Sequence, residues 1–79
     1  MTNEEAARIV LKIFADKGTT AGQMIMKGAL EHAFLTPDGR KVSELEDGVN
    51  RGIEQGWLQE AGDGVTLTAA GFAAMKQTG

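Results

Sequence analysis

The chain has 79 residues, no cysteine and a formal net charge of −3 at pH 7. A chain of this length forms a single domain with a modest core, and the absence of cysteine excludes disulfide bonds and thiolate metal ligands. A composition of 42% hydrophobic and 24% charged residues is typical of a folded globular protein rather than a disordered one. No apolar run approaches the roughly 20 residues that cross a bilayer. The N-terminus is too acidic for a signal peptide, so we expect a cytoplasmic protein that makes no membrane contact.

The acidic residues are concentrated in the middle of the chain. Residues 31–63 include eight acidic and three basic side chains, a local charge of −5, whereas the remainder of the chain sums to +2. A nucleic-acid-binding domain normally carries a basic patch as its electrostatic footprint. The charge distribution therefore disfavours DNA or RNA as a partner.

Residues 3–16 are predicted to form the first helix. Thr2 and Glu5 have the spacing of a capping box, which closes the N-terminus of a helix. The apolar residues recur with the three- and four-residue spacing of a core-facing stripe: Ala6, Ile9, Val10, Ile13 and Phe14. Ala7 and Leu11 widen this stripe, so the helix is either buried on two sides or in contact with a partner.

Residues 21–34 are predicted to form a second helix, with Thr20 and Gln23 as its capping box. Its apolar stripe comprises Met26, Leu30, Ala33 and Phe34, with Ile25 and Ala29 beside it. We expect Met24 and Met26 to pack in the core or at its edge, although an adaptable methionine-lined contact surface is an alternative.

The segment from residue 35 to residue 42 contains Pro37-Asp38-Gly39, a sequence typical of a turn. Residues 35–36 and 41–42 could pair briefly on either side of this turn. Whether the segment is a hairpin or a loop stays open.

Residues 43–55 are predicted to form the third helix, which Ser43 caps together with Glu46 and which Gly56 ends. Two short strands, at about 57–60 and 65–67, then form a hairpin whose turn contains glycine and aspartate. Thr68 caps a last helix over residues 69–77, in which Phe72 and Met75 face inward. The expected fold is α+β and mostly helical.

The third helix contains two internal glycines, Gly48 and Gly52, although each glycine in a helix interior costs about 1 kcal/mol relative to alanine. At about 100° per residue, both glycines fall beside the ridge of Leu45, Val49 and Ile53, on the buried side of the helix. We interpret them as the place where a neighbouring helix approaches closely, because a missing side chain lets two backbones come near.

Several short sequence motifs in residues 43–75 follow one another in an order that is known from a family of small domains: Ile53, then Gly56-Trp57-Leu58, then Gly62-Asp63-Gly64, then Leu67-Thr68-Ala69-Ala70-Gly71. This part of the chain, 33 of its 79 residues, resembles the second half of a winged helix-turn-helix domain of the MarR/PadR kind. The resemblance implies that residues 43–55 are a recognition helix and that residues 60–65 are the wing. The chain departs from the pattern at residues 35–42, because a helix-turn-helix joins its helices by about three or four residues.

The outer face of the third helix also departs from this pattern. This acidic face, as we call it, carries four acids and one arginine: Glu44, Glu46, Asp47, Asn50, Arg51 and Glu54. Asn50 and Arg51 are suited to reading bases, and Arg40 and Lys41 could contact phosphates, but the neighbouring acids would repel a DNA backbone. Three interpretations stay open: a solvated face, a surface that binds a basic partner, or DNA reading in a homodimer.

The sequence offers little for catalysis or metal binding. His32 is the only histidine and Ser43 the only serine, and Ser43 lacks the flanking glycines of a nucleophile elbow. Glu44 and Asp47 could share a metal ion, but adjacent surface acids are common on helices. Trp57 is expected to pack at the base of the hairpin, with an exposed interface anchor as the alternative.

We therefore expect a non-enzymatic winged-helix-like domain without cofactor or metal. The leading hypothesis is a protein-binding accessory or regulatory factor that uses the acidic face. Homodimerisation through the first or last helix stays open. The second hypothesis is a DNA-binding transcriptional regulator, and the third is an acidic inhibitor that mimics DNA.

Overall fold

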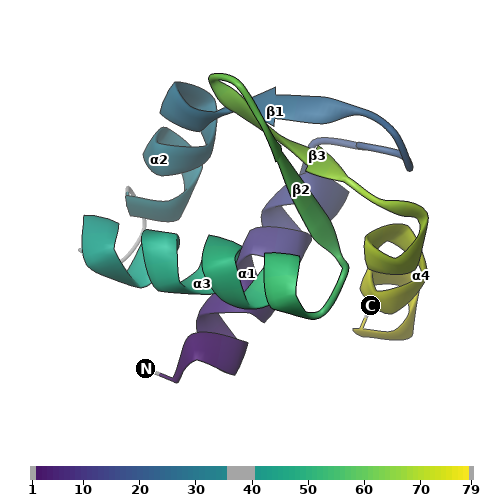
Figure 1. Cartoon of the computed structure of the whole chain (residues 1–79), viewed down its shortest axis with the longest axis horizontal. Coiled ribbons are helices and arrows are strands. Elements are labelled where there is room, and N and C mark those ends of the chain that lie inside the picture. Colours follow the sequence, from purple (N-terminus) through teal and green to yellow (C-terminus); the bar gives the residue numbers. More distant parts are fainter. Residues whose placement is uncertain (1, 36–40, 79) are drawn as a thin grey trace.

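The structure, a computed structural model, describes residues 2–35 and 41–78. The elements in chain order are α1 (Asn3–Asp16), β1 (Met24–Met26), α2 (Lys27–Leu35), α3 (Val42–Glu54), β2 (Leu58–Ala61), β3 (Gly64–Leu67) and α4 (Ala69–Thr78). The strands form an antiparallel sheet in the order β1-β3-β2. In Figure 1 the sheet lies above α1 and α3, α2 lies beside them, and α4 follows the base of the hairpin. The predicted α+β, mostly helical fold class is confirmed at this level.

Helix α1 is the centre of the core and has the predicted boundaries. Thr2 caps it, because its hydroxyl accepts a hydrogen bond from the backbone N–H of Glu5 at 3.1 Å. The side chains of Ala7, Val10, Leu11 and Phe14 are completely buried. The helix is therefore buried on two sides by α2, α3, α4 and the sheet, and its wide apolar surface is used within the domain.

Helices α1 and α3 pack with their backbones in close contact. A Cβ atom placed on Gly48 would lie 2.7 Å from the backbone carbon of Ala6 and 2.8 Å from its oxygen, which no side-chain rotation relieves. Gly48 therefore confirms the predicted close approach of a neighbouring helix. At Gly52 the neighbour is instead the side chain of Leu58 in β2, which would lie 2.5 Å from a Cβ atom placed on Gly52. The prediction that a neighbouring helix packs against Gly52 is wrong, although the structure does leave no space for a side chain at this position.

The predicted helix over residues 21–34 is wrong over residues 21–26. Gly22 has a positive φ of 89°, which a continuing helix does not allow, and its N–H donates to the carbonyl of Leu67 at 2.7 Å. The expected contact of Thr20 N–H with the Gln23 side chain forms at 2.9 Å, but within a turn rather than a helix start. The following three residues form β1, whose backbone pairs with β3.

Strand β1 also changes the expected burial of its side chains, because successive residues of a strand point to opposite faces. Ile25 faces the core and is 7% exposed, whereas Met24 and Met26 face outward and are each 49% exposed. The placement of Met26 on a buried helical stripe is therefore wrong. The remainder of the stripe is confirmed for Leu30 and Phe34, which are buried on α2.

Helix α3 begins one residue before the predicted start, and Ser43 is not its cap. The N-cap is Lys41, whose backbone N–H donates to the carboxylate of Glu44 at 2.9 Å. Glu44 thus closes the helix end that Ser43 and Glu46 were expected to close. Leu35 ends α2 and Val42 begins α3, so neither belongs to a strand, and the turn at 37–39 lies outside the described residues.

The hairpin and the last helix follow the prediction with small shifts. The strands pair from Leu58 with Leu67 to Ala61 with Gly64, so the loop is Gly62-Asp63 alone, with Gly62 at a positive φ of 56°. Thr68 caps α4 as predicted, because its hydroxyl accepts from the N–H of Gly71 at 3.0 Å. The same hydroxyl donates to the carbonyl of Gly56, which ties the end of α3 to the start of α4.

Replacing Gly48 with alanine is expected to destabilise the protein. The added methyl group meets the Ala6 backbone, and overpacking of this kind costs about 1–3 kcal/mol, more than the roughly 1 kcal/mol that alanine contributes to helix stability. Gly28→Ala in α2 is the matched control, because a Cβ there meets nothing within 4 Å. Urea denaturation should show a lower midpoint for Gly48→Ala and an equal or higher one for Gly28→Ala. A Gly48→Ala protein as stable as the control would contradict the close packing.

Replacing Gly52 with leucine is expected to lower the free energy of unfolding by about 1–3 kcal/mol through overpacking against Leu58. The double variant Gly52→Leu/Leu58→Ala separates this contact from other effects, because it vacates the space that the new side chain needs. In a double-mutant cycle the two changes should compensate each other in part. Strictly additive losses, or a gain in stability from Gly52→Leu alone, would refute the explanation.

Candidate functional site

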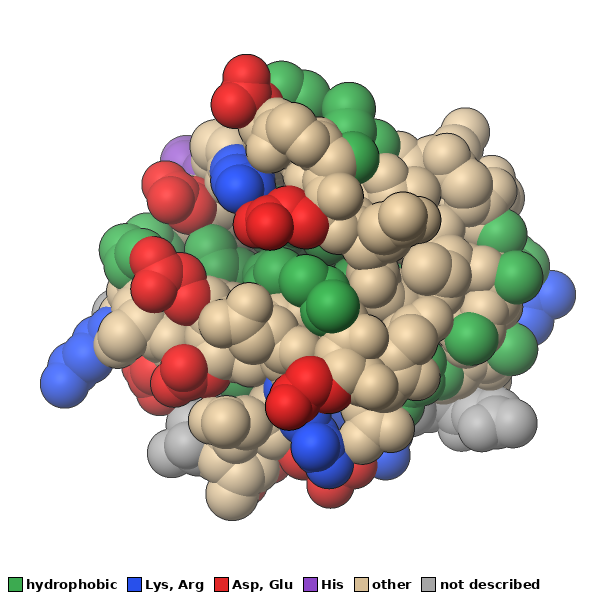
Figure 2. Space-filling model, in the orientation of Figure 1, with side chains coloured by type: hydrophobic (Ala, Val, Ile, Leu, Met, Phe, Trp, Pro, Cys, Tyr) green, Lys and Arg blue, Asp and Glu red, His purple; other side chains and the backbone are tan. Residues whose placement is uncertain are grey.

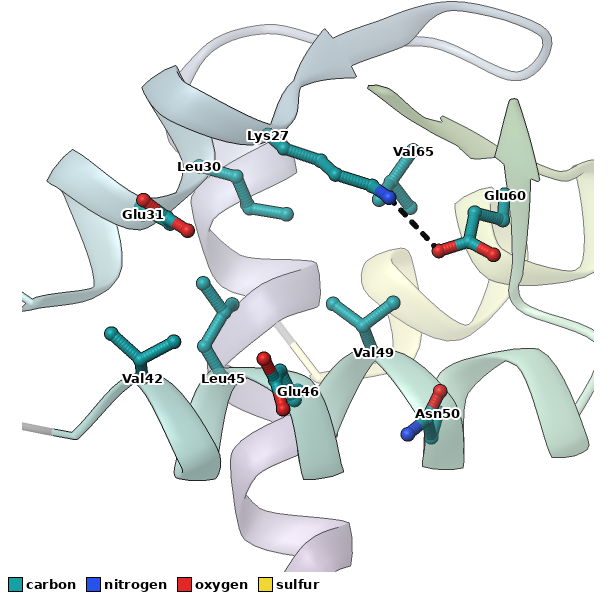
Figure 3. Close-up of a pocket in the computed structure, with 10 residues that line it drawn as sticks. All are labelled: Lys27, Leu30, Glu31, Val42, Leu45, Glu46, Val49, Asn50, Glu60 and Val65. Carbon is teal, nitrogen blue, oxygen red and sulfur yellow. Dashed lines mark hydrogen bonds and ion pairs between the residues drawn. The ribbon is translucent and has the colours of Figure 1, made fainter. Parts of the chain in front are cut away.

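A cleft of about 280 Å³ opens between α2, α3 and the β2–β3 hairpin. In Figure 2 it is a hollow with hydrophobic side chains at its bottom and acidic ones around it. Ten residues line this α2–α3 cleft, as we call it, and are drawn in Figure 3: Lys27, Leu30, Glu31, Val42, Leu45, Glu46, Val49, Asn50, Glu60 and Val65.

The floor of the cleft is aliphatic. Leu30 from α2, Leu45 from α3 and Val65 from β3 are buried, and they join the floor to the hydrophobic core. Val42 is 44% exposed and Val49 is partly buried, so the floor continues along α3 onto the surface. The cleft therefore presents an aliphatic surface that the rest of the chain covers only in part.

The rim of the cleft is acidic. Glu31 on α2, Glu46 on α3 and Glu60 on β2 stand around the opening with one basic residue, Lys27, a local charge of −2. The ammonium group of Lys27 reaches across from α2 and donates to a carboxylate oxygen of Glu60 at 3.0 Å (Figure 3). Both side chains are about half exposed, and such surface pairs contribute only about 0–1 kcal/mol. This ion pair can therefore open at little cost in stability.

Strand alternation explains why a charged residue and an aliphatic residue share this wall. Glu60 pairs with Val65 across the hairpin, so both point to the same face of the sheet. Leu58 and Leu67, two residues nearer the base, lie on that face too and are buried. The core-facing side of the sheet thus extends past the edge of the core and becomes one wall of the cleft.

The structure divides the acidic face of α3 into parts with different surroundings. Glu46 and Asn50 are exposed and line the cleft. Glu44 is partly buried and serves as the cap of the helix. Asp47 and Glu54 are exposed on the remaining surface.

The one arginine of this face, Arg51, is partly buried, and its guanidinium lies 3.8 Å from the carboxylate of Glu54. Glu46 and Asp47, on the same helix, are exposed carboxylates. The acidic face of α3 thus contains exposed carboxylates and one ion pair, between Arg51 and Glu54.

Of the four residues that were considered for DNA contact, the three that the structure describes do not form a basic surface. Lys41 is exposed at the start of α3, Arg51 is engaged with Glu54, and Asn50 lies among the acids of the cleft. Arg40 lies outside the described residues. Strands β2 and β3 contain no lysine or arginine, so the hairpin adds no positive charge.

Trp57 packs where α3 ends and the hairpin begins. Its ring is partly buried against the core, and the guanidinium of Arg8 on α1 lies 5.9 Å from the ring centroid. Its backbone N–H closes the end of α3 by donating to Gly52 at 2.8 Å. Packing at the base of the hairpin, the first of the two predictions for this residue, is what the described contacts support.

Within residues 2–35 and 41–78, no three histidine, cysteine, aspartate or glutamate side chains are grouped so that they could hold a metal ion. His32 on α2 and Ser43 on α3 are both exposed. In the same ranges, no helix has the length and apolarity needed to span a membrane.

The sequence analysis predicted only two of the ten residues that line the cleft. It found Glu46 and Asn50, but Lys27, Glu31, Glu60 and the aliphatic floor were not expected to meet. One signal was available, since Val42 and Val49 fall next to Glu46 on the helical wheel, on the edge between the buried and the acidic sides. The contributions from α2 and the hairpin depend on contacts between segments far apart in the chain.

Comparisons with protein-family models, with curated proteins and with solved structures found no match to this chain.

Proposed function

We propose that this chain is a winged-helix-like, non-enzymatic module that binds another protein through the acidic face of α3. The fold is compatible with the winged-helix part of this proposal. Two consecutive helices, α2 and α3, are followed directly by a two-stranded hairpin and a further helix at the residues that carried the resemblance. Six residues separate α2 from α3, which is longer than the turn of a standard helix-turn-helix.

The observation that carries the proposal is the exposed negative charge on and around α3. Glu46, Asp47 and Glu54 are exposed, and Glu31 and Glu60 add to the same side at the cleft. Oppositely charged surfaces steer partners together and exclude partners of like charge. An acidic recognition surface therefore favours a basic protein and disfavours nucleic acid.

The surroundings of the candidate catalytic residues support a binding role rather than catalysis. An active site usually places titratable groups together in a cleft where their environment tunes them. The α2–α3 cleft is lined by aliphatic side chains, carboxylates, one amide and one ammonium group, and its ten lining residues include no hydroxyl, thiol or imidazole nucleophile. Binding of a polypeptide is the function that such a surface supports best.

The second candidate, a DNA-binding transcriptional regulator, is favoured by one observation: a helix followed by a hairpin occupies the places of a recognition helix and a wing. In this reading Arg40, Lys41, Asn50 and Arg51 would contact the DNA. The charge of the same elements opposes it, because the phosphate backbone supplies most of the affinity of DNA-binding proteins and requires basic contacts.

Protein binding is tested by reversing the charge of three residues of the acidic face. The triple variant Glu46→Lys/Asp47→Lys/Glu54→Lys should lose partners that the native chain retains from extracts of its own cells. The control Glu4→Lys/Asp16→Lys/Asp63→Lys makes the same change in charge at exposed sites elsewhere, on α1 and in the hairpin loop. It should keep those partners. Partners that survive the first variant, or are lost equally from both, would show that the acidic face is only solvated.

DNA binding is tested with generic duplex DNA in an electrophoretic mobility assay at about 50 mM salt, where phosphate contacts are strongest. We expect no shift at micromolar protein. The variant with lysine at positions 46, 47 and 54 gives an internal comparison, since it should bind weakly and in a salt-dependent manner. Salt-dependent binding by the native chain would reverse the order of the two candidates.

A further inference from the structure

We propose that the α2–α3 cleft is the docking site for a basic amphipathic helix of the partner protein. The inference rests on the proposed protein-binding function and specifies the place of contact and the chemistry of the bound segment. The site lies at one side of the acidic face and adds residues of α2 and the hairpin to it.

The apolar part of the cleft is a surface against which aliphatic side chains can pack. Val42, Leu45 and Val49 follow one another at three- and four-residue spacing on α3, a stripe about 10 Å long at 1.5 Å per residue. Leu30 and Val65 stand across the cleft from this stripe in Figure 3. A helix that lays two or three aliphatic side chains against a groove of this kind uses the same spacing on its own surface.

The charged part of the cleft selects a basic segment. Glu31, Glu46 and Glu60 come from three different elements and surround the aliphatic floor. Lysine or arginine residues that flank the aliphatic side chains of a docked helix would therefore meet carboxylates on each side. An acidic segment would face at least three like charges, which makes the rim a means of excluding wrong partners.

The size and the walls of the cleft argue against other occupants. Its volume of about 280 Å³ lies at the lower limit of the roughly 300–1,000 Å³ of typical small-molecule sites. Two of its three walls are helices, whose backbone groups are satisfied internally, so they recognise through side chains. A helix fits such walls because it also brings a satisfied backbone, whereas an extended peptide needs backbone partners.

Lys27, through its ion pair with Glu60, competes with the basic side chains of a partner for the carboxylate of Glu60. The ammonium group occupies a carboxylate oxygen that a basic side chain of the partner would otherwise contact. Because the pair is exposed and weak, an incoming lysine or arginine can replace it. Removing Lys27 should therefore strengthen binding, an effect opposite in sign to that of structural damage.

The test begins with selection of peptides, from a random 16-residue library displayed on phage, that bind the full chain. The enriched sequences are expected to carry aliphatic residues at three- and four-residue spacing, interrupted by lysine and arginine. Amide chemical-shift changes in the labelled chain should map each bound peptide to the walls of the cleft. Enrichment of neutral or acidic sequences, no enrichment at all, or shifts confined to another surface would overturn the proposal.

Matched variants then test the contacts with one of the selected peptides. Glu46→Lys, at the rim, should weaken binding about tenfold. Asp47→Lys makes the same change in charge one residue away, outside the cleft, and should alter binding by less than about twofold. Lys27→Gln should tighten binding by up to about fivefold. All three positions are exposed, so the variants should unfold at nearly the native temperature.

Two results separate this inference from the proposed function. Equal losses from Glu46→Lys and Asp47→Lys would remove the cleft as the docking site but would leave binding through the broader acidic face. Loss of native partners from the triple variant of the acidic face, together with unchanged binding in Glu46→Lys alone, would have the same meaning. Retention of partners by the triple variant would instead refute the function itself.

Discussion

The close contact between α1 and α3 is the constraint on which the remainder of the structure depends. At Gly48 the two backbones are so near that the Ala6 backbone occupies the place of a side chain. This contact fixes the rotation of α3 about its axis. With the Gly48 side turned toward α1, the edge that carries Val42 and Val49 faces the cleft, and Glu46, Asp47 and Glu54 face solvent. The glycines that weaken the helix by their intrinsic propensity thus determine which of its side chains are exposed.

The sheet supplies the second half of the site through strand alternation. Pairing of β1 with β3 places Ile25 and Val65 toward the core, and pairing of β2 with β3 brings Glu60 to the same face as Val65. Near the base of the hairpin this face carries Leu58 and Leu67, which are buried in the core. Nearer the loop Val65 is still buried, but its cross-strand neighbour Glu60 is exposed and its carboxylate bonds to Lys27. The boundary between core and cleft therefore crosses this face of the hairpin between Leu58 and Glu60.

Local signals in the sequence predicted the elements whose ends are closed by nearby residues. The cap formed by Thr2 with Glu5 predicted the start of α1, and Thr68 predicted the start of α4. Local signals failed where a distant segment competes for the same backbone groups. The residues before α2 have apolar spacing compatible with a helix, yet β3, some 40 residues later, takes their hydrogen bonds. At the start of α3 two candidate caps lie within one turn, and the carboxylate of Glu44 prevails over the hydroxyl of Ser43.

The sequence by itself determined the class of the fold, the acidic character of α3 and the need for a close neighbour at Gly48, because each depends on residue type and spacing along one element. Only the tertiary structure decided that Glu46 and Asn50 belong to a cleft while Glu44 and Arg51 do not. It also brought Lys27, Glu31, Glu60 and Val65 to the same place. The physical reason is that a cleft is made by the packing of separate elements, whose relative positions follow from the core as a whole.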